Sequence, residues 1–276
     1  MLEEIYQSVS ETLRKAEAII VTSGAGMGVD SGLPDFRGDQ GFWRAYPPYE
    51  RLNISFVDAA NPRHFGDDPA FGWGFYGHRT NLYRDTVPHA GFGIIHSWIE
   101  RLDLDWFVVT SNVDGQFQKA GFAADRVLEV HGSIHHLQCT VPCGSTIRDN
   151  TESFGVDLDT MRSRQVPRCP DCGAVARPNI LMFGDWSWLG HRTEEQGRRF
   201  EAFLSTHDHS RLVVLEMGAG TGIPTIRHLG ERICARRDAL LVRINPREPE
   251  AGGTHASLPV GALEGLRGID RALGGG

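Results

Sequence analysis

The sequence predicts an α/β fold in which a doubly wound parallel sheet has a smaller lobe beside it. Three observations predict this fold. Short apolar runs recur along the chain between helical or loop sequence, a glycine-rich turn follows the first run, and one segment that breaks the alternation holds four of the five cysteines.

The helices are expected where apolar residues repeat at helical spacing. Residues 2–17 show this spacing and predict an amphipathic helix before the first strand. Further helices are expected at residues 92–103 and 193–205. In the last of these, Thr193 and Gln196 have the spacing of a capping box.

The strands are expected where short runs rich in Val, Leu and Ile occur, because such runs are typical of strands buried on both faces. These runs are residues 18–23, 106–111, 127–131, 211–217 and 239–244. Parallel strands place their carboxyl ends at one edge of a sheet, so polar residues that follow these runs are candidates for one shared site.

Two segments interrupt the alternation. Residues 45–90 hold many Pro, Gly and aromatic residues, and residues 138–177 hold the clustered cysteines. We interpret residues 1–276 as one domain in which these segments are inserts that build the smaller lobe. A ligand is then expected in the cleft between the lobes.

Composition excludes several classes of protein. The 276 residues are 40% hydrophobic and 23% charged, which is ordinary for a globular protein with a large core. The net charge is −7 and no run of Lys and Arg occurs, which argues against a nucleic-acid partner. No apolar stretch is long enough to span a membrane, and no export signal begins the chain, so we expect a cytoplasmic protein without a membrane partner.

Four cysteines have the spacing of a metal site. Cys139 and Cys143, followed by Cys169 and Cys172, form a Cys-x3-Cys and a Cys-x2-Cys pair. In a reducing compartment, paired cysteines of this kind are more often zinc ligands than disulfides, and the ion would order a lobe with little core of its own. The fifth, Cys234, is expected to be a buried thiol in a helix.

A Gly-Ala-Gly turn directly follows the first predicted strand. Gly24, Ala25 and Gly26 would let backbone N–H groups approach a pyrophosphate closely, although glycines after a strand also form plain turns. A dinucleotide-binding fold would continue into a long helix, but here Pro34 interrupts and Asp35-Phe36-Arg37-Gly38 follows.

The run from Ser31 to Arg37 resembles the signature of the sirtuins, the NAD-dependent protein lysine deacylases, and departs from it only at Leu33. Further motifs similar to those of the family follow in its order: Thr110-Ser111-Asn112-Val113-Asp114, Ala120-Gly121, Val130-His131-Gly132, Arg177-Pro178-Asn179-Ile180-Leu181-Met182-Phe183-Gly184-Asp185, Gly218-Ala219-Gly220 and Ile244-Asn245. The resemblance spans nearly the whole chain.

This resemblance implies a Rossmann-like sheet with a small zinc-binding lobe, NAD and zinc as cofactors, and an acyl-lysine protein or peptide as substrate. It assigns catalysis to His131 and Asn112, cofactor binding to Gly24, Ala25, Gly26, Asp35, Phe36, Arg37, Asn112, Asp114, Gly218, Ala219, Gly220 and Asn245, and substrate binding to Ile180, Phe183, Gly184 and Asp185. The family's second motif reads Gln where this chain has Ser111, and its Phe-Gly-Glu is Phe-Gly-Asp185 here, so an altered substrate choice is expected.

Tyr76 and Arg79 form a Tyr-x-x-Arg pair like that of the sirtuins that remove succinyl or malonyl groups. Three residues apart, they would share one helical face and could together hold a carboxylate. The alternative is that Tyr76 only packs and Arg79 pairs with an acid such as Asp85.

Three other functions remain. A mono-ADP-ribosyltransferase on the same scaffold would transfer ADP-ribose to a protein side chain, and a non-catalytic module would only bind NAD. A hydride-transferring dehydrogenase fits less well, since the segment around Asp35 and the cysteine insert have no place in its fingerprint.

Overall fold

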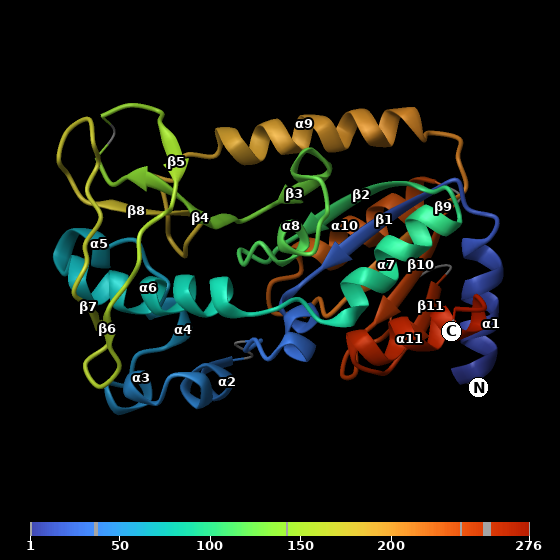
Figure 1. The fold of residues 1–276 in the computed structure, drawn as a ribbon, viewed down its shortest axis with the longest axis horizontal. Coiled ribbons are helices and arrows are strands. Elements are labelled where there is room, and N and C mark those ends of the chain that lie inside the picture. Colours follow the sequence, from blue (N-terminus) through green and yellow to red (C-terminus); the bar gives the residue numbers. More distant parts are fainter. Residues whose placement is uncertain (1, 36–37, 142, 238, 251–254, 276) are drawn as a thin grey trace.

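The computed structural model describes residues 2–35, 38–141, 143–237, 239–250 and 255–275. Its centre is a six-stranded parallel sheet with the order β11-β10-β9-β1-β2-β3 (Figure 1). The strands are β1 (Ala18–Ser23), β2 (Asp105–Thr110), β3 (Val127–Glu129), β9 (Leu212–Met217), β10 (Ala239–Ile244) and β11 (His255–Leu258). β1 and β9 are neighbours at the point where the strand order reverses, which is where ligands bind in open α/β sheets.

Helices cover both faces of this sheet. On one face lie α1 (Leu2–Leu13), α7 (Ala90–Arg101) and α11 (Ala262–Ala272), and on the other lie α9 (His191–Thr206) and α10 (Thr225–Arg236). Strand β1 shows how a parallel strand serves both layers: Ile19 and Val21 pack in one core, while Ala18 and Ile20 pack in the other.

The smaller lobe lies at the opposite end of the molecule from the two termini (Figure 1). Its helices are α2 (Gly38–Ala45), α3 (Pro47–Arg51), α4 (Phe56–Ala59), α5 (His64–Asp67) and α6 (Pro69–Asp85). An antiparallel sheet of the order β5-β4-β8 joins β4 (Gly132–Cys139), β5 (Ile147–Asp149) and β8 (Ala176–Ile180), and β6 (Val156–Asp157) pairs with β7 (Arg162–Ser163). The remaining elements are the short helices η1 (Ala25–Ser31), α8 (Gln116–Lys119) and η2 (Ala124–Arg126).

The structure confirms the α/β class and the five expected strands, with small differences at their ends. β3 stops at Glu129, so His131 lies in a turn rather than at the end of a strand. Helix α1 ends at Leu13, and α7 spans residues 90–101 rather than 92–103.

The expected capping box in α9 is wrong. The helix begins at His191, and the Thr193 hydroxyl donates to the Glu129 carbonyl at 3.1 Å. The Gln196 side-chain carbonyl accepts from the Glu129 N–H at 3.1 Å. Both side chains therefore fasten α9 to the end of β3.

Within the described ranges, the structure contains no helix with the length and apolar character needed to cross a membrane.

Candidate functional site

The glycine turn after β1 packs directly against the backbone of the turn after β9. The Gly24 N–H donates to the Met217 carbonyl and the Gly26 N–H to the Gly218 carbonyl, both at 3.0 Å. A Cβ on Gly26 would lie 2.6 Å from the Gly218 Cα, and Gly218 itself has a φ of +61°. These positions therefore require glycine for the close approach of two loops as well as for any ligand. Ala25 begins η1, and Ala219 and Gly220 continue the facing loop.

Two asparagines hold these loops from either side. The Asn112 Nδ2 donates to the Gly24 carbonyl at 3.0 Å, and the Asn245 Nδ2 donates to the Ala219 carbonyl at 2.9 Å. Arg227 of α10 also donates to the Ala219 carbonyl, at 3.3 Å, and to the Glu248 carbonyl at 2.9 Å. Arg227 has no sequence signature, because one arginine on an amphipathic helix gives no signal that it is buried.

Asp114 lies in the loop after β2 with its carboxylate buried. Burial raises the pKa of this carboxyl to about 6, although the Gln116 N–H, which donates to its Oδ1 at 3.0 Å, opposes the shift. The His135 ring bonds to the Asp114 backbone carbonyl at 2.9 Å. Asp114 can therefore hold or release a proton near neutral pH.

His131 lies where the chain crosses from the large sheet into the small one, between β3 and β4. Gly132 makes the crossing possible: its φ is +77°, and a Cβ there would lie 2.1 Å from the Asn179 carbonyl oxygen. Burial lowers the pKa of His131, and a hydrogen bond to the Ser111 backbone opposes this shift. The imidazole is therefore neutral at pH 7, which is the form that accepts a proton.

Asp35 closes one loop of the site onto another. Its Oδ2 lies 2.5 Å from an Arg247 nitrogen, in an ion pair between the loop after η1 and the loop after β10. The predicted cofactor residues Phe36 and Arg37 lie outside the described residues.

The predicted substrate segment begins where β8 ends and returns past His131. Ile180 is the last residue of β8, and the Leu181 N–H donates to the His131 carbonyl at 3.0 Å. The Phe183 N–H donates to the Ala60 carbonyl, and Gly184 has a φ of +67°. The Asp185 carboxylate pairs with Arg177 at 2.8 Å, and both side chains are buried.

Tyr76 and Arg79 both lie buried on α6. Arg79 donates from Nε and Nη2 to the Tyr83 hydroxyl, at 2.9 and 2.7 Å. Tyr83 belongs to none of the predicted motifs, although its i+4 spacing from Arg79 was available as a signal.

The four clustered cysteines fit a zinc ion. Their sulfur atoms lie within 4.8 Å of one another, and the pairs Cys139–Cys172 and Cys143–Cys169 are each 3.6 Å apart. Tetrahedral zinc with bonds of about 2.3 Å requires sulfurs about 3.8 Å apart. The donor set is closed, so such an ion would have a structural role. Cys234 on α10 is partly buried, and burial raises its pKa to about 11.

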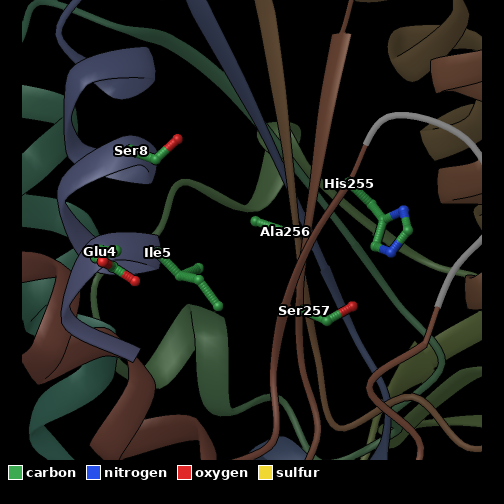
Figure 2. Close-up of a pocket in the computed structure, with 6 residues that line it drawn as sticks. All are labelled: Glu4, Ile5, Ser8, His255, Ala256 and Ser257. Carbon is green, nitrogen blue, oxygen red and sulfur yellow. The ribbon is translucent and has the colours of Figure 1, made fainter. Parts of the chain in front are cut away.

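A separate pocket of about 360 Å³ lies between α1 and β11, at an outer edge of the sheet (Figure 2). Its lining residues are Glu4, Ile5 and Ser8 of α1 and residues 255–257 of β11, of which Ala256 points toward α1 while His255 and Ser257 point away from it. Its lining comes from the sheet edge, so it is distinct from the site around His131.

Comparison with known proteins gives consistent matches. A family model described as the Sir2 family matches residues 24–201. The "NAD-dependent protein deacylase 1" of Caldanaerobacter subterraneus subsp. tengcongensis is 28% identical over 262 residues, which cover 94% of this chain and 95% of the relative. The "NAD-dependent protein deacylase" of Leptospira interrogans is 30% identical over 233 residues, with coverage of 84% and 82%.

Solved structures share the fold. A Sir2 homologue in complex with ADP-ribose superimposes with a TM-score of 0.70 at 24% identity, covering 97% of both chains. A Sir2 homologue in complex with NAD gives a TM-score of 0.69 at 22% identity, covering 96% of this chain and 94% of the other.

Proposed function

Since this chain belongs to the Sir2 family, we propose that it is an NAD-dependent protein lysine deacylase, which transfers the acyl group of a modified lysine to ADP-ribose and releases nicotinamide. The names of its relatives support this function. The observation that carries it is that the loops after β1, β2, β3 and β10 bring Gly24, Asn112, Asp114, His131 and Asn245 to the carboxyl edge of one sheet.

NAD, when bound, supplies an electrophilic anomeric carbon with nicotinamide as its leaving group. The loops of Gly24–Gly26 and Gly218–Gly220 bind the cofactor, and Asn112 fixes the first of them through the Gly24 carbonyl. Asp114 and Asp35 hold the nicotinamide end. His131, neutral and partly shielded from water, accepts a proton from a ribose hydroxyl. Cys139, Cys143, Cys169 and Cys172 would hold a zinc ion, which would fix the small lobe and take no part in the reaction.

The substrate is proposed to be an extended acyl-lysine peptide. It would lie as an added strand between Phe183–Asp185 and Gly218–Thr221, through main-chain hydrogen bonds that tolerate many sequences. The buried Arg177–Asp185 pair supports this by fixing the first of the two segments.

The decisive experiment incubates the protein with NAD and acyl-lysine peptides and follows products by mass spectrometry. We expect nicotinamide and O-acyl-ADP-ribose only when NAD and an acylated peptide are both present, and unmodified peptide serves as the control. A mass gain of one ADP-ribose on a protein would favour the mono-ADP-ribosyltransferase. Binding of NAD without any product would favour the non-catalytic module.

For the acyl group, we propose that Tyr76 and Arg79 favour succinyl or malonyl over acetyl. A hydrogen bond to a charged group contributes about 1.5–3 kcal/mol, so Arg79→Met should lower the efficiency of desuccinylation about 10- to 100-fold and spare deacetylation. Arg162→Met, which removes an exposed arginine of the same lobe, is the matched control. If the unmodified enzyme prefers acetyl-lysine, or both activities fall alike, the acidic-acyl assignment is wrong.

We propose one catalytic domain over residues 1–276, in which segments 45–90 and 138–177 build the small lobe, and a cytoplasmic location. The zinc-type cysteine cluster supports a reducing compartment. The net charge of −7 supports a protein substrate rather than nucleic acid or an anionic membrane surface. Cell fractionation with antibody detection tests the location.

A further inference from the structure

The guanidinium of Arg79 lies in an aromatic cage. Its Cζ is 5.0 Å from the ring centre of Phe75, 5.7 Å from that of Tyr76 and 5.2 Å from that of Tyr83. The residue is 7% exposed. A buried guanidinium keeps its charge, so its N–H groups need acceptors whether or not a substrate is bound.

Tyr83 supplies such an acceptor through a single oxygen. Its hydroxyl accepts from Nε at 2.9 Å and from Nη2 at 2.7 Å. These two N–H groups form one edge of the guanidinium, and that edge matches the two oxygens of a carboxylate. Burial raises the pKa of Tyr83 despite the opposing charge of Arg79, so the acceptor is an uncharged phenol.

This pair borders the candidate site. The Gln116 side-chain amide donates to the Tyr83 backbone carbonyl at 3.4 Å, which ties the end of α6 to the loop that carries Asp114. The positive charge of Arg79 also acts on the Asp114 carboxyl. A group bound by Arg79 would therefore lie close to the reacting end of the substrate.

We propose that Tyr83 is a specificity-determining residue of the deacylase, because its hydroxyl occupies the edge of Arg79 that an acidic acyl group would use. The inference rests on the proposed function. With a neutral acyl group in the site, Tyr83 keeps Arg79 hydrogen-bonded, so such substrates are tolerated. A succinyl or malonyl carboxylate must displace the hydroxyl before it can bind both N–H groups. Tyr83 thus weakens the preference for acidic acyl groups that Arg79 would confer.

The test is Tyr83→Phe, which removes one oxygen and keeps the ring. We expect the ratio of kcat/KM for succinyl-lysine over acetyl-lysine peptide to rise about ten-fold, because the hydroxyl that competes with the carboxylate for Arg79 is lost. The change should appear mainly as a lower KM for the succinyl peptide. When Arg79→Met is already present, the further change Tyr83→Phe should leave this ratio the same as in Arg79→Met alone.

Tyr49→Phe is the matched control, since its hydroxyl is buried in the same aromatic cluster and has no hydrogen-bond partner among the described residues. An unchanged ratio in Tyr83→Phe would overturn the proposal, and a fall would mean that Tyr83 donates to the carboxylate instead. Thermal unfolding with each peptide gives a second readout, in which succinyl peptide should stabilise Tyr83→Phe more than acetyl peptide does. If the unmodified enzyme releases nicotinamide with neither peptide, it is the proposed function that fails.

Discussion

The two lobes are held together by different chemistry. In the large lobe, every residue of β1 and β9 is buried, and mainly aliphatic side chains fill the cores on both faces of the sheet. In the small lobe, the core is a cluster of aromatic rings, and the segments around it depend on four cysteines and the buried Arg177–Asp185 pair. Both lobes also bury an ion pair, Arg243–Glu216 in the large sheet and Arg177–Asp185 in the small lobe. The lobes therefore differ in the aliphatic or aromatic character of their cores and in the cysteine cluster, which only the small lobe carries among the described residues.

The site lies at the joint between these two regions. His131 and Gly132 carry the chain out of the large sheet, and the Leu181 N–H bonds back to the His131 carbonyl. We therefore expect changes in the small lobe to disturb the substrate side, and changes in the large lobe to disturb the cofactor side.

The largest effect is expected from removing zinc. Zinc binding contributes about 10–16 kcal/mol of folding free energy in small modules, so chelation should unfold the small lobe while the large sheet persists. Regional hydrogen exchange measures this difference, and metal analysis should find one zinc per chain. Cys234→Ser, outside the cluster, is the control and should keep the metal. Freshly purified protein that is stable and free of zinc would contradict this prediction.

The next largest effect is expected on turnover, without a matching loss of NAD binding. His131→Ala should reduce turnover by about 10²- to 10⁴-fold, because it removes the proposed base, while NAD binding stays nearly intact. Nicotinamide release and calorimetric NAD titration measure the two quantities. His96→Ala, a partly exposed histidine of α7, should leave both unchanged. Equal turnover by the parent and His131→Ala would remove the proposed base.

The same contrast explains which elements the sequence could predict. Strands such as β1 and β10 match their expected bounds because a short apolar run buried on both faces has few alternatives. Helix α6 gave no periodic signal because it is buried almost all round: a Cβ on Gly74 would meet Met161, and one on Gly77 would meet Phe154. Strand β11, short and at the sheet edge, also escaped prediction.

The candidate site residues that belong to a sequence motif could be predicted from the sequence, but their hydrogen-bond partners could not. Asn112 was assigned to the cofactor, yet its bond to the Gly24 carbonyl depends on two strands being neighbours. Arg227 acts through contacts made after folding and has no local pattern, whereas Tyr83 has only its i+4 spacing from Arg79 as a signal. The sequence shows that Asp185 stands where the family has Glu, but it does not show that the carboxylate is buried against Arg177.

A smaller effect is expected on the pH dependence of stability, and it arises from the buried carboxyl of Asp114. Burial raises the pKa of Asp114 from 3.8 to about 6, so between these pH values the unfolded chain loses a proton that the folded protein keeps. Stability is then lost as pH rises through this window, by on the order of 3 kcal/mol. Asp114→Asn should be more stable than the parent at pH 7, and the advantage should vanish near pH 4.

Urea unfolding at the two pH values measures this change. Asp125→Asn, in η2 and exposed, controls for the removal of one negative charge. An advantage for Asp114→Asn that does not depend on pH would contradict the explanation.

The smallest effect is expected at the ion pair that closes the cofactor loops. Arg247 and Asp35 have side chains that are 57% and 24% exposed, in contrast to the buried Arg177–Asp185 pair of the small lobe. Exposed pairs contribute about 0–1 kcal/mol and are screened by salt. Arg247→Gln should therefore lower the free energy of unfolding by less than about 1 kcal/mol, and the difference from the parent should shrink at about 1 M salt. Denaturant unfolding at low and high salt measures it. A loss above about 2 kcal/mol that salt does not change would mean that this exposed pair stabilises its loops as strongly as a buried pair does. The contrast between the Arg247–Asp35 and Arg177–Asp185 pairs would then be wrong.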